Sequence, residues 1–169
     1  MGKYFYNCKT AEECKRLYYK LAKQYHADNG GDDSIMARIN AEYREAWERL
    51  KDVHMDTKTG ETYQNTGSKR TTETPEEFID IVSKLAQLGL EIELVGTWLW
   101  LSGNTYPHRD TLKLYGCRWS KSKKRWYWTT DPYTKTRKTY SMNDIRFRYG
   151  SEMLNTDKFR HAQIPQQEV

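Results

Sequence analysis

Residues 74–103 read TPEEFIDIVSKLAQLGLEIELVGTWLWLSG, and this stretch predicts a helix followed by a pair of strands. Thr74, Pro75 and Glu77 are typical of a helix start, because threonine caps the helix, proline suits its first position and glutamate completes a capping box. Gly89 then ends the helix. Between these signals, apolar residues recur at helical spacing: Phe78, Ile81, Val82, Leu85 and Leu88.

The next residues carry the pattern of strands. Residues 90–95 alternate apolar and charged side chains, and Gly96 allows a tight turn into residues 98–103. Because residues 98–103 are apolar on both faces, we expect this strand to be covered on each side. Residues 104–116 predict a short helix, and residues 117–128 predict a second hairpin with a basic turn at its tip.

Two amphipathic helices are predicted in the first third of the chain. Thr10 caps the first helix, which ends near His26 ahead of the Gly30-Gly31 pair. Asp32 or Asp33 caps the second helix. Both carry apolar stripes at helical spacing: Cys14, Leu17, Tyr18, Leu21, Ala22 and Tyr25 in the first, and Ile35, Ile39, Tyr43, Ala46, Trp47 and Leu50 in the second. A short polar loop between such helices predicts an antiparallel hairpin.

These elements predict an α+β protein made of two units that fold separately. An N-terminal antiparallel helical hairpin (residues 1–52) is joined by a flexible linker (residues 53–73), rich in Thr, Gly, Ser and Asn, to a small α+β domain with two β-hairpins (residues 74–150). Within that domain, residues 139–149 add a strand or a helix. Residues 151–169 are expected to form a flexible tail.

Composition excludes several classes of protein. The chain has 169 residues, a net charge of +5 and 37% hydrophobic residues, and its mean hydropathy is −1.00. No apolar run approaches the roughly 20 residues of a spanning helix, so we expect no membrane partner, and the N-terminus lacks the apolar core of a signal peptide. Three cysteines at no disulfide or zinc spacing predict reduced thiols and a cytoplasmic location.

Positive charge is concentrated in residues 113–149, which hold 11 Lys and Arg against 2 Asp and Glu, a net charge of +9. Such a segment attracts polyanions, and aromatic rings among the cations provide surfaces on which bases stack. The segment therefore predicts DNA or RNA binding; the alternative is that the rings form a core and the charges a solvated face. The candidate nucleic-acid residues are Arg118, Lys121, Lys123, Lys124, Arg125, Trp126, Trp128, Lys135, Arg137 and Lys138.

The N-terminal part resembles a J-domain, the module by which DnaJ-type co-chaperones engage DnaK-type chaperones. Residues 4–52 carry the resemblance through an LA-K-x-Y-H run, the loop His26-Ala27-Asp28 and an I-N-A-E-Y-R run in the second helix. His26 and Asp28 match the family's His-Pro-Asp tripeptide, whereas Ala27 stands where the family has proline. The resemblance implies a chaperone-docking site made of His26 and Asp28 with basic residues of the first helix: Lys15, Arg16, Lys20 and Lys23.

The C-terminal part looks like a small module of phage, plasmid and mobile-element proteins, through a short helix with Leu-Lys, then Gly-x-Arg-Trp, a basic turn and Trp-Tyr-Trp. The combination is similar to small phage-type, DnaJ-like proteins of Gram-positive bacteria. This resemblance implies a fold rather than an activity.

Enzymatic motifs are missing from the sequence. It has no Walker-type loop, no GxSxG and no HExxH. Residues 28–33 superficially suggest a calcium loop, but the glycine and glutamate of the EF-hand pattern are absent. We therefore expect no enzyme, no cofactor and no metal.

Three functions remain open at this point. The first is a J-domain-like co-chaperone or adaptor that docks a DnaK-type chaperone or another partner through the helical hairpin. The second is a nucleic-acid-binding accessory protein of a phage or mobile element. The third is a phage-type inhibitor of a host enzyme that acts by protein–protein contact.

Overall fold

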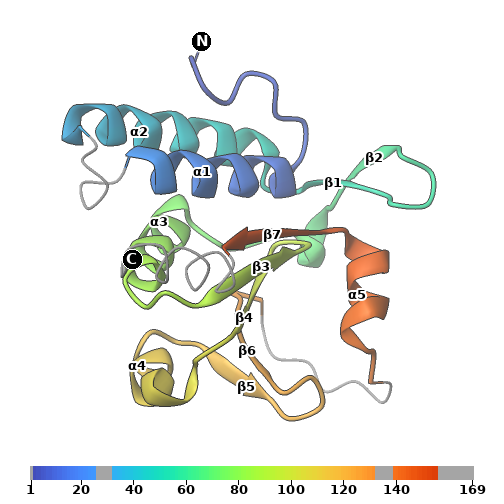
Figure 1. Ribbon diagram of the computed structural model, residues 1–169. Coiled ribbons are helices and arrows are strands. Elements are labelled where there is room, and N and C mark those ends of the chain that lie inside the picture. The colour runs from blue at the N-terminus through green and yellow to red at the C-terminus, as the bar shows by residue number, and fades with distance from the viewer. Residues whose placement is uncertain (1, 26–31, 132–138, 156–169) are drawn as a thin grey trace, which may run out of the picture.

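The computed structural model describes residues 2–25, 32–131 and 139–155 (Figure 1). The described chain is mixed helix and sheet, which confirms the predicted α+β class. Its helices and strands follow one another as α1 (Ala11–Tyr25), α2 (Asp33–Leu50), β1 (Val53–Met55), β2 (Thr62–Gln64), α3 (Pro75–Ala86), β3 (Glu91–Val95), β4 (Trp98–Ser102), α4 (Arg109–Leu114), β5 (Arg118–Ser120), β6 (Arg125–Trp128), α5 (Met142–Tyr149) and β7 (Ser151–Asn155). Short 3₁₀ turns lie at Gly67–Lys69 and Tyr106–His108.

Helix boundaries follow the capping signals. The side-chain oxygen of Thr10 accepts a hydrogen bond from Glu13 N at 3.2 Å, and that of Thr74 accepts one from Glu77 N at 3.3 Å. Asp32 caps α2 by accepting from Ser34 N at 2.8 Å. Each bond satisfies a backbone donor that the first helical turn leaves unpaired.

A five-stranded antiparallel sheet forms the centre of the molecule, with strand order β5-β6-β4-β3-β7. The two predicted hairpins are its β3–β4 and β5–β6 pairs. The pairing of β4 with β6 joins them, so that Trp100 lies opposite Tyr127. Strand β7 then adds to the free edge of β3.

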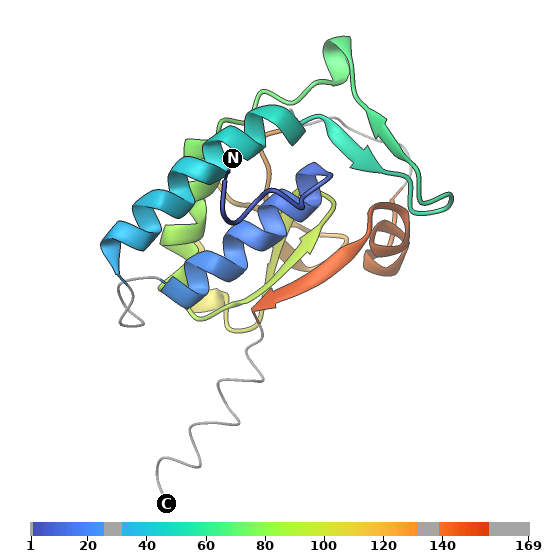
Figure 2. The same ribbon diagram turned by 90° about the horizontal axis from the view of Figure 1, so that it is seen from above.

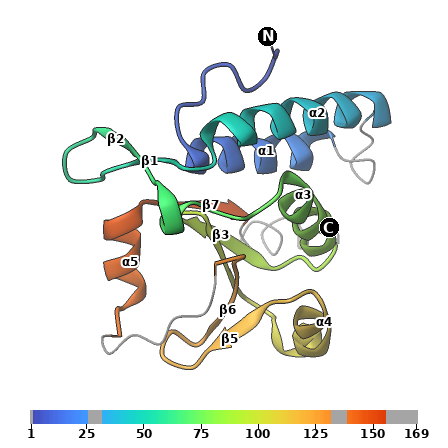
Figure 3. The same ribbon diagram turned by 180° about the vertical axis from the view of Figure 1, so that it is seen from behind.

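Helices α1, α2 and α3 cover one face of this sheet. Figures 1 and 2 show α1 and α2 side by side and antiparallel above the sheet, with α3 beside them. The helix-facing strand residues are fully buried, with Leu94, Leu99 and Leu101 each at most 1% exposed. In the view from behind, α5 and the β1–β2 hairpin lie at one end of the sheet and α3 and α4 at the other (Figure 3).

The predicted division into separately folding units is wrong. One hydrophobic core contains Tyr18 and Trp47 of the helical hairpin together with Phe78, Leu99 and Trp128 of the following elements. The first helix buries a second side beyond its predicted stripe, and that side lies on the sheet. The two parts therefore form a single structural unit.

The predicted linker and tail are also corrected. Residues 53–73 include the β1–β2 hairpin, and their ends are held by Asp52, whose carboxylate accepts from Thr71 N at 2.7 Å and Arg70 Nε at 3.2 Å. Residues 151–155 form β7. Their own apolar pattern is weak, and pairing with β3 stabilises them as a strand. Residues 156–169 lie outside the described residues.

Candidate nucleic-acid interface

The first residue of the predicted chaperone-docking set, Lys15, lies inside the protein. Its side chain is 0% exposed, and its Nζ is 2.6 Å from Glu73 Oε2 and donates to Thr97 O at 2.9 Å. The ammonium also lies over the rings of Trp47, Phe78 and Trp128, at 4.6 to 5.5 Å from their centroids. Lys15 therefore belongs to the core, and its predicted place on an exposed basic face is wrong.

Two other members of that set contact the sheet. Arg16 Nε and Lys20 Nζ form ion pairs with the two carboxylate oxygens of Glu152 on β7, at 2.5 and 2.8 Å. Lys23 is exposed near the end of α1. His26 and Asp28 fall outside the described residues.

The sheet face opposite the helices carries a second set of aromatic residues. Side chains alternate between faces along a strand, so Trp98 and Trp100 of β4 lie on this face while Leu99 and Leu101 face the helices. The antiparallel register places Tyr127 beside Trp100 and Arg118 beside Tyr127. Arg118, Tyr127 and Trp100 consequently form a row across three neighbouring strands.

We call Trp98, Trp100 and Tyr127 the ring cluster, because all three rings are in mutual contact. Trp98 stacks on Tyr127 with centroids 5.4 Å apart and an interplanar angle of 15°, and Trp100 lies 5.1 Å from Tyr127 and 6.2 Å from Trp98. Trp98 and Tyr127 are half-buried, whereas Trp100 is 5% exposed. The cluster therefore presents parts of two rings at the surface.

Beside the ring cluster lies the basic hairpin, by which we mean residues 118–125: strand β5, the turn after it and the first residue of β6. It carries five cations: Arg118, Lys121, Lys123, Lys124 and Arg125. Within the described residues, none of the five forms an ion pair with a carboxylate. Lys123 Nζ lies 5.6 Å from the Trp100 ring centroid, so a cation and a ring meet directly.

Backbone geometry holds the tip of the basic hairpin in one shape. Lys124 has a φ of 53°, the left-handed conformation that a non-glycine residue seldom adopts outside a turn. Its N–H donates to Ser120 O at 2.8 Å, and Lys123 N donates to Ser120 Oγ at 3.3 Å. The turn therefore projects Lys121 and Lys124 as exposed side chains.

Acidic groups near the ring cluster are occupied by neutral or charged donors. Glu93 accepts two hydrogen bonds from the Arg146 guanidinium of α5, at 2.6 and 2.8 Å, and these bonds raise the pKa of Arg146. Asp131 accepts from Trp98 Nε1 at 2.8 Å and so fixes the orientation of that indole. Glu91 accepts from Ser102 Oγ at 3.0 Å.

The structure divides the predicted nucleic-acid residues into three groups. Trp126 and Trp128 are 6% and 7% exposed and face the helices, so the prediction that they stack on bases is wrong. The five cations of the basic hairpin lie at or near the surface, and their role in nucleic-acid binding stays a prediction. Lys135, Arg137 and Lys138 fall outside the described residues.

Sequence reasoning missed the ring cluster as a site. The sequence predicted Trp98 and Trp100 only as part of a strand covered on both sides. For residues 126–128 it predicted Trp126 and Trp128, rather than Tyr127, as the rings that stack on bases. The signal that separates them is the alternation of faces, because Tyr127 must face away from Trp126 and Trp128. Which of these faces meets the helices follows only from the pairing of β4 with β6.

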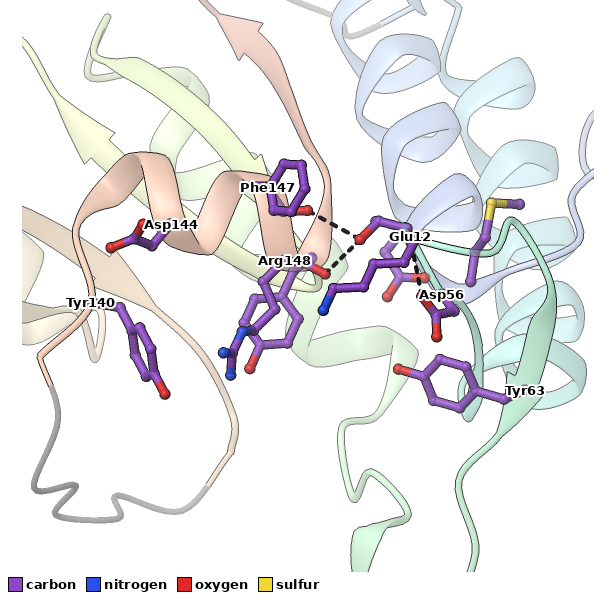
Figure 4. A pocket seen from close by; sticks show the side chains of 11 residues that line it. Glu12, Asp56, Tyr63, Tyr140, Asp144, Phe147 and Arg148 are labelled. Atoms are coloured by element: carbon purple, nitrogen blue, oxygen red, sulfur yellow. Dashed lines mark hydrogen bonds between the residues drawn. The ribbon is translucent and has the colours of Figure 1, made fainter.

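A cleft lies between the β1–β2 hairpin and α5, with a volume of about 730 Å³ (Figure 4). Thr57 donates to the carbonyl oxygens of Phe147 and Arg148 at 3.0 Å each, which ties the hairpin to the helix. The rings that line the cleft include those of Tyr63 and Phe147, which are 49% and 73% exposed.

Three charged groups that line this cleft, those of Glu12, Asp144 and Arg148, are engaged in local contacts. Glu12 Oε1 lies 2.6 Å from His54 Nδ1, and the Arg148 guanidinium lies 4.6 Å from the centroid of the Tyr140 ring. Asp144 belongs to the capping box of α5. The cleft therefore has a smaller excess of unpaired charge than the basic hairpin.

The described residues contain no exposed cysteine thiol and no cluster of metal-ligating side chains. Cys8, Cys14 and Cys117 are free and buried, and burial raises the pKa of Cys117 to about 12, which keeps this thiol protonated at neutral pH. Within residues 2–25, 32–131 and 139–155, no three His, Cys, Asp or Glu side chains gather as a metal site. Across the same residues, no helix combines the length and apolar character that crossing a membrane requires.

No family model, curated protein or solved structure matches this chain. The resemblance to J-domains stays a prediction.

Proposed function

We propose that this protein binds nucleic acid through the basic hairpin and the adjoining ring cluster. The observation that carries the proposal is the set of five cations within residues 118–125 that have no carboxylate partner among the described residues. Elsewhere in the described residues several cations have carboxylate partners, among them Lys15, Arg16 and Arg146, and cations without such a partner, such as Lys9 and Lys69, lie on separate elements rather than within one short segment. A cluster of unneutralised cations favours a polyanion, because phosphates replace the counterions and release them to solution.

The experiment is a salt titration of binding to a labelled oligonucleotide, followed by fluorescence anisotropy. Replacing both Lys121 and Lys124 with glutamine removes two exposed cations from the turn without touching the core. The slope of log K against log salt should become shallower by about 1.4 for a single strand, or about 1.8 for a duplex, since each phosphate contact contributes roughly 0.7 or 0.9.

A matched control carries the same loss of charge on other elements. Lys9 and Lys69 are exposed residues outside the basic hairpin, so their double replacement by glutamine should leave the slope nearly unchanged. Equal effects of the two double variants would indicate a general charge effect and contradict the proposed site. Absence of binding at about 20 mM salt would contradict the function itself.

The chaperone-docking hypothesis has weaker geometric support. A partner that used Lys15 would have to withdraw it from contact with Glu73 in the core, and a partner that used Arg16 would compete with Glu152. The measurement that tests this hypothesis is the ATPase rate of a DnaK-type chaperone with and without the protein.

A further inference from the structure

The ring cluster and the basic hairpin together indicate which form of nucleic acid the surface accepts. We infer that the ligand is single-stranded nucleic acid, whose unpaired bases contact the ring cluster while its phosphates lie along the basic hairpin. This inference rests on the function proposed above and names its substrate class.

The first step in the argument is the order of groups across the sheet. Arg118 on β5, Tyr127 on β6 and Trp100 on β4 are register partners, with the neutralised pair of Glu93 and Arg146 at the far end of the row. Neighbouring strands lie about 4.8 Å apart, so about 10 Å separate the Arg118 backbone from the Trp100 backbone. The cation lies at the edge of the sheet and the rings lie nearer its centre. This order fits a nucleic-acid strand whose phosphates lie along the edge of the sheet and whose bases point towards its centre.

The second step is the position of the rings within the fold. Tyr127 and Trp98 lie on central strands, and β6 pairs with β5 on one side and β4 on the other. A duplex keeps its bases paired at the centre of the helix, where rings fixed on a sheet surface do not reach them. A β-ribbon that enters a major groove needs both of its strands free, whereas in the β5–β6 hairpin only β5 has an unpaired edge, because β6 also pairs with β4.

The third step concerns how rigidly the cluster is held. Asp131 fixes the Trp98 indole at 2.8 Å, and Lys123 lies over Trp100. A fixed ring loses little conformational freedom when a base stacks on it, which favours binding. Base–ring stacking is also tolerant of sequence, so we expect little base preference.

The experiment compares a labelled single-stranded 15-mer with the duplex of the same sequence, using the full chain and fluorescence anisotropy at low salt. We expect the single strand to bind at least tenfold more tightly than the duplex. Tyr127→Leu should weaken single-strand binding by about 5- to 30-fold, the lower part of the stacking range because the ring is half-buried. Duplex binding, which depends on the cations alone, should change less than twofold.

Two further variants make the test decisive. Trp98→Leu removes a different ring of the same cluster and replaces Tyr127→Leu if that variant does not fold, and Tyr106→Leu removes a tyrosine that is 73% exposed on a separate 3₁₀ turn. Only the ring-cluster variants should lower single-strand affinity.

Each outcome bears on one of the two proposals. Equal affinity for the two forms, or ring-cluster variants without effect while the Lys121→Gln/Lys124→Gln protein still binds more weakly, overturns the single-strand inference and leaves nucleic-acid binding in place. Failure of both forms to bind overturns the proposed function and, with it, this inference.

Discussion

Replacing Lys15 with methionine should lower the free energy of unfolding by about 3–4 kcal/mol, within the range for breaking a buried ion pair. Glu73, 5% exposed, would keep its carboxylate in the core with the Thr130 hydroxyl, at 3.1 Å, as a remaining donor. Methionine retains most of the aliphatic stem among Trp47, Phe78 and Trp128, so a cavity adds little to the cost. Because the free energy of unfolding of a typical protein is about 5–15 kcal/mol, we expect the variant to remain folded with a low stability.

The matched control is the double variant Lys15→Met with Glu73→Gln. It removes both charges and leaves a neutral amide, so we expect a loss of only about 1–2 kcal/mol, because a buried pair can often be replaced by neutral groups at small cost. Thermodynamic coupling between the two sites should therefore exceed about 1 kcal/mol. No coupling would contradict a direct interaction between Lys15 and Glu73.

The pH dependence of the Lys15→Met variant gives an independent check. Burial raises the pKa of Glu73, while the charge of Lys15 lowers it, so removing Lys15 should raise the pKa further. Between the ordinary carboxyl pKa and this raised value, the native state binds more protons than the unfolded state. The variant's stability should consequently rise as the pH falls from 7 towards 5.

Urea unfolding followed by far-ultraviolet circular dichroism and by tryptophan fluorescence measures all of these quantities. Lys15 connects α1 to the sheet, and both belong to one hydrophobic core. The circular dichroism and fluorescence signals should therefore show a single coincident transition. Two separated transitions, or a loss below about 1 kcal/mol in Lys15→Met, would refute the assignment of this pair to the interior.

Three further predictions concern other elements. Thr74→Ala should cost about 1 kcal/mol in urea unfolding because Glu77 N loses its capping acceptor, whereas Thr74→Ser should restore most of it, and equal losses would contradict the cap. Glu152→Gln should cost less than about 1 kcal/mol, and the cost should shrink in high salt, because its ion pairs with α1 are partly exposed; a salt-independent cost would contradict this account. The three cysteines should react slowly with a thiol reagent in the native protein at pH 8 and rapidly in urea, and fast native labelling would contradict their burial.

Local patterns predicted the elements of this fold well. The caps at Thr10 and Thr74 and the turns of the β3–β4 and β5–β6 hairpins depend on short-range signals, and the structure confirms them. Strand β7 was missed because it has little pattern of its own and is stabilised by pairing with β3 and by ion pairs with α1. Such contacts join residues far apart in the sequence.

The candidate site was predictable only in part, for the same reason. The cations of the basic hairpin follow directly from the sequence, but Lys15 reads as a solvated residue because it lies off the apolar stripe of α1. Its burial follows from the sheet that covers this side of the helix and from Glu73, which lies 58 residues away. Trp126 and Tyr127 differ in a similar way, since only the tertiary arrangement decides which side of β6 meets the helices.

The buried ion pair and the ring cluster lie on opposite faces of the sheet, yet they are connected through the backbone. Lys15 donates to Thr97 O, directly before Trp98, and Thr130 donates to Glu73, directly before Asp131. Asp131 in turn accepts from the Trp98 indole. The charge pair on the helix side of the sheet thus anchors the start of β4 and the chain that follows β6, the two segments that orient Trp98. The helices of this protein therefore stabilise the sheet and also help to position the aromatic surface on its other side.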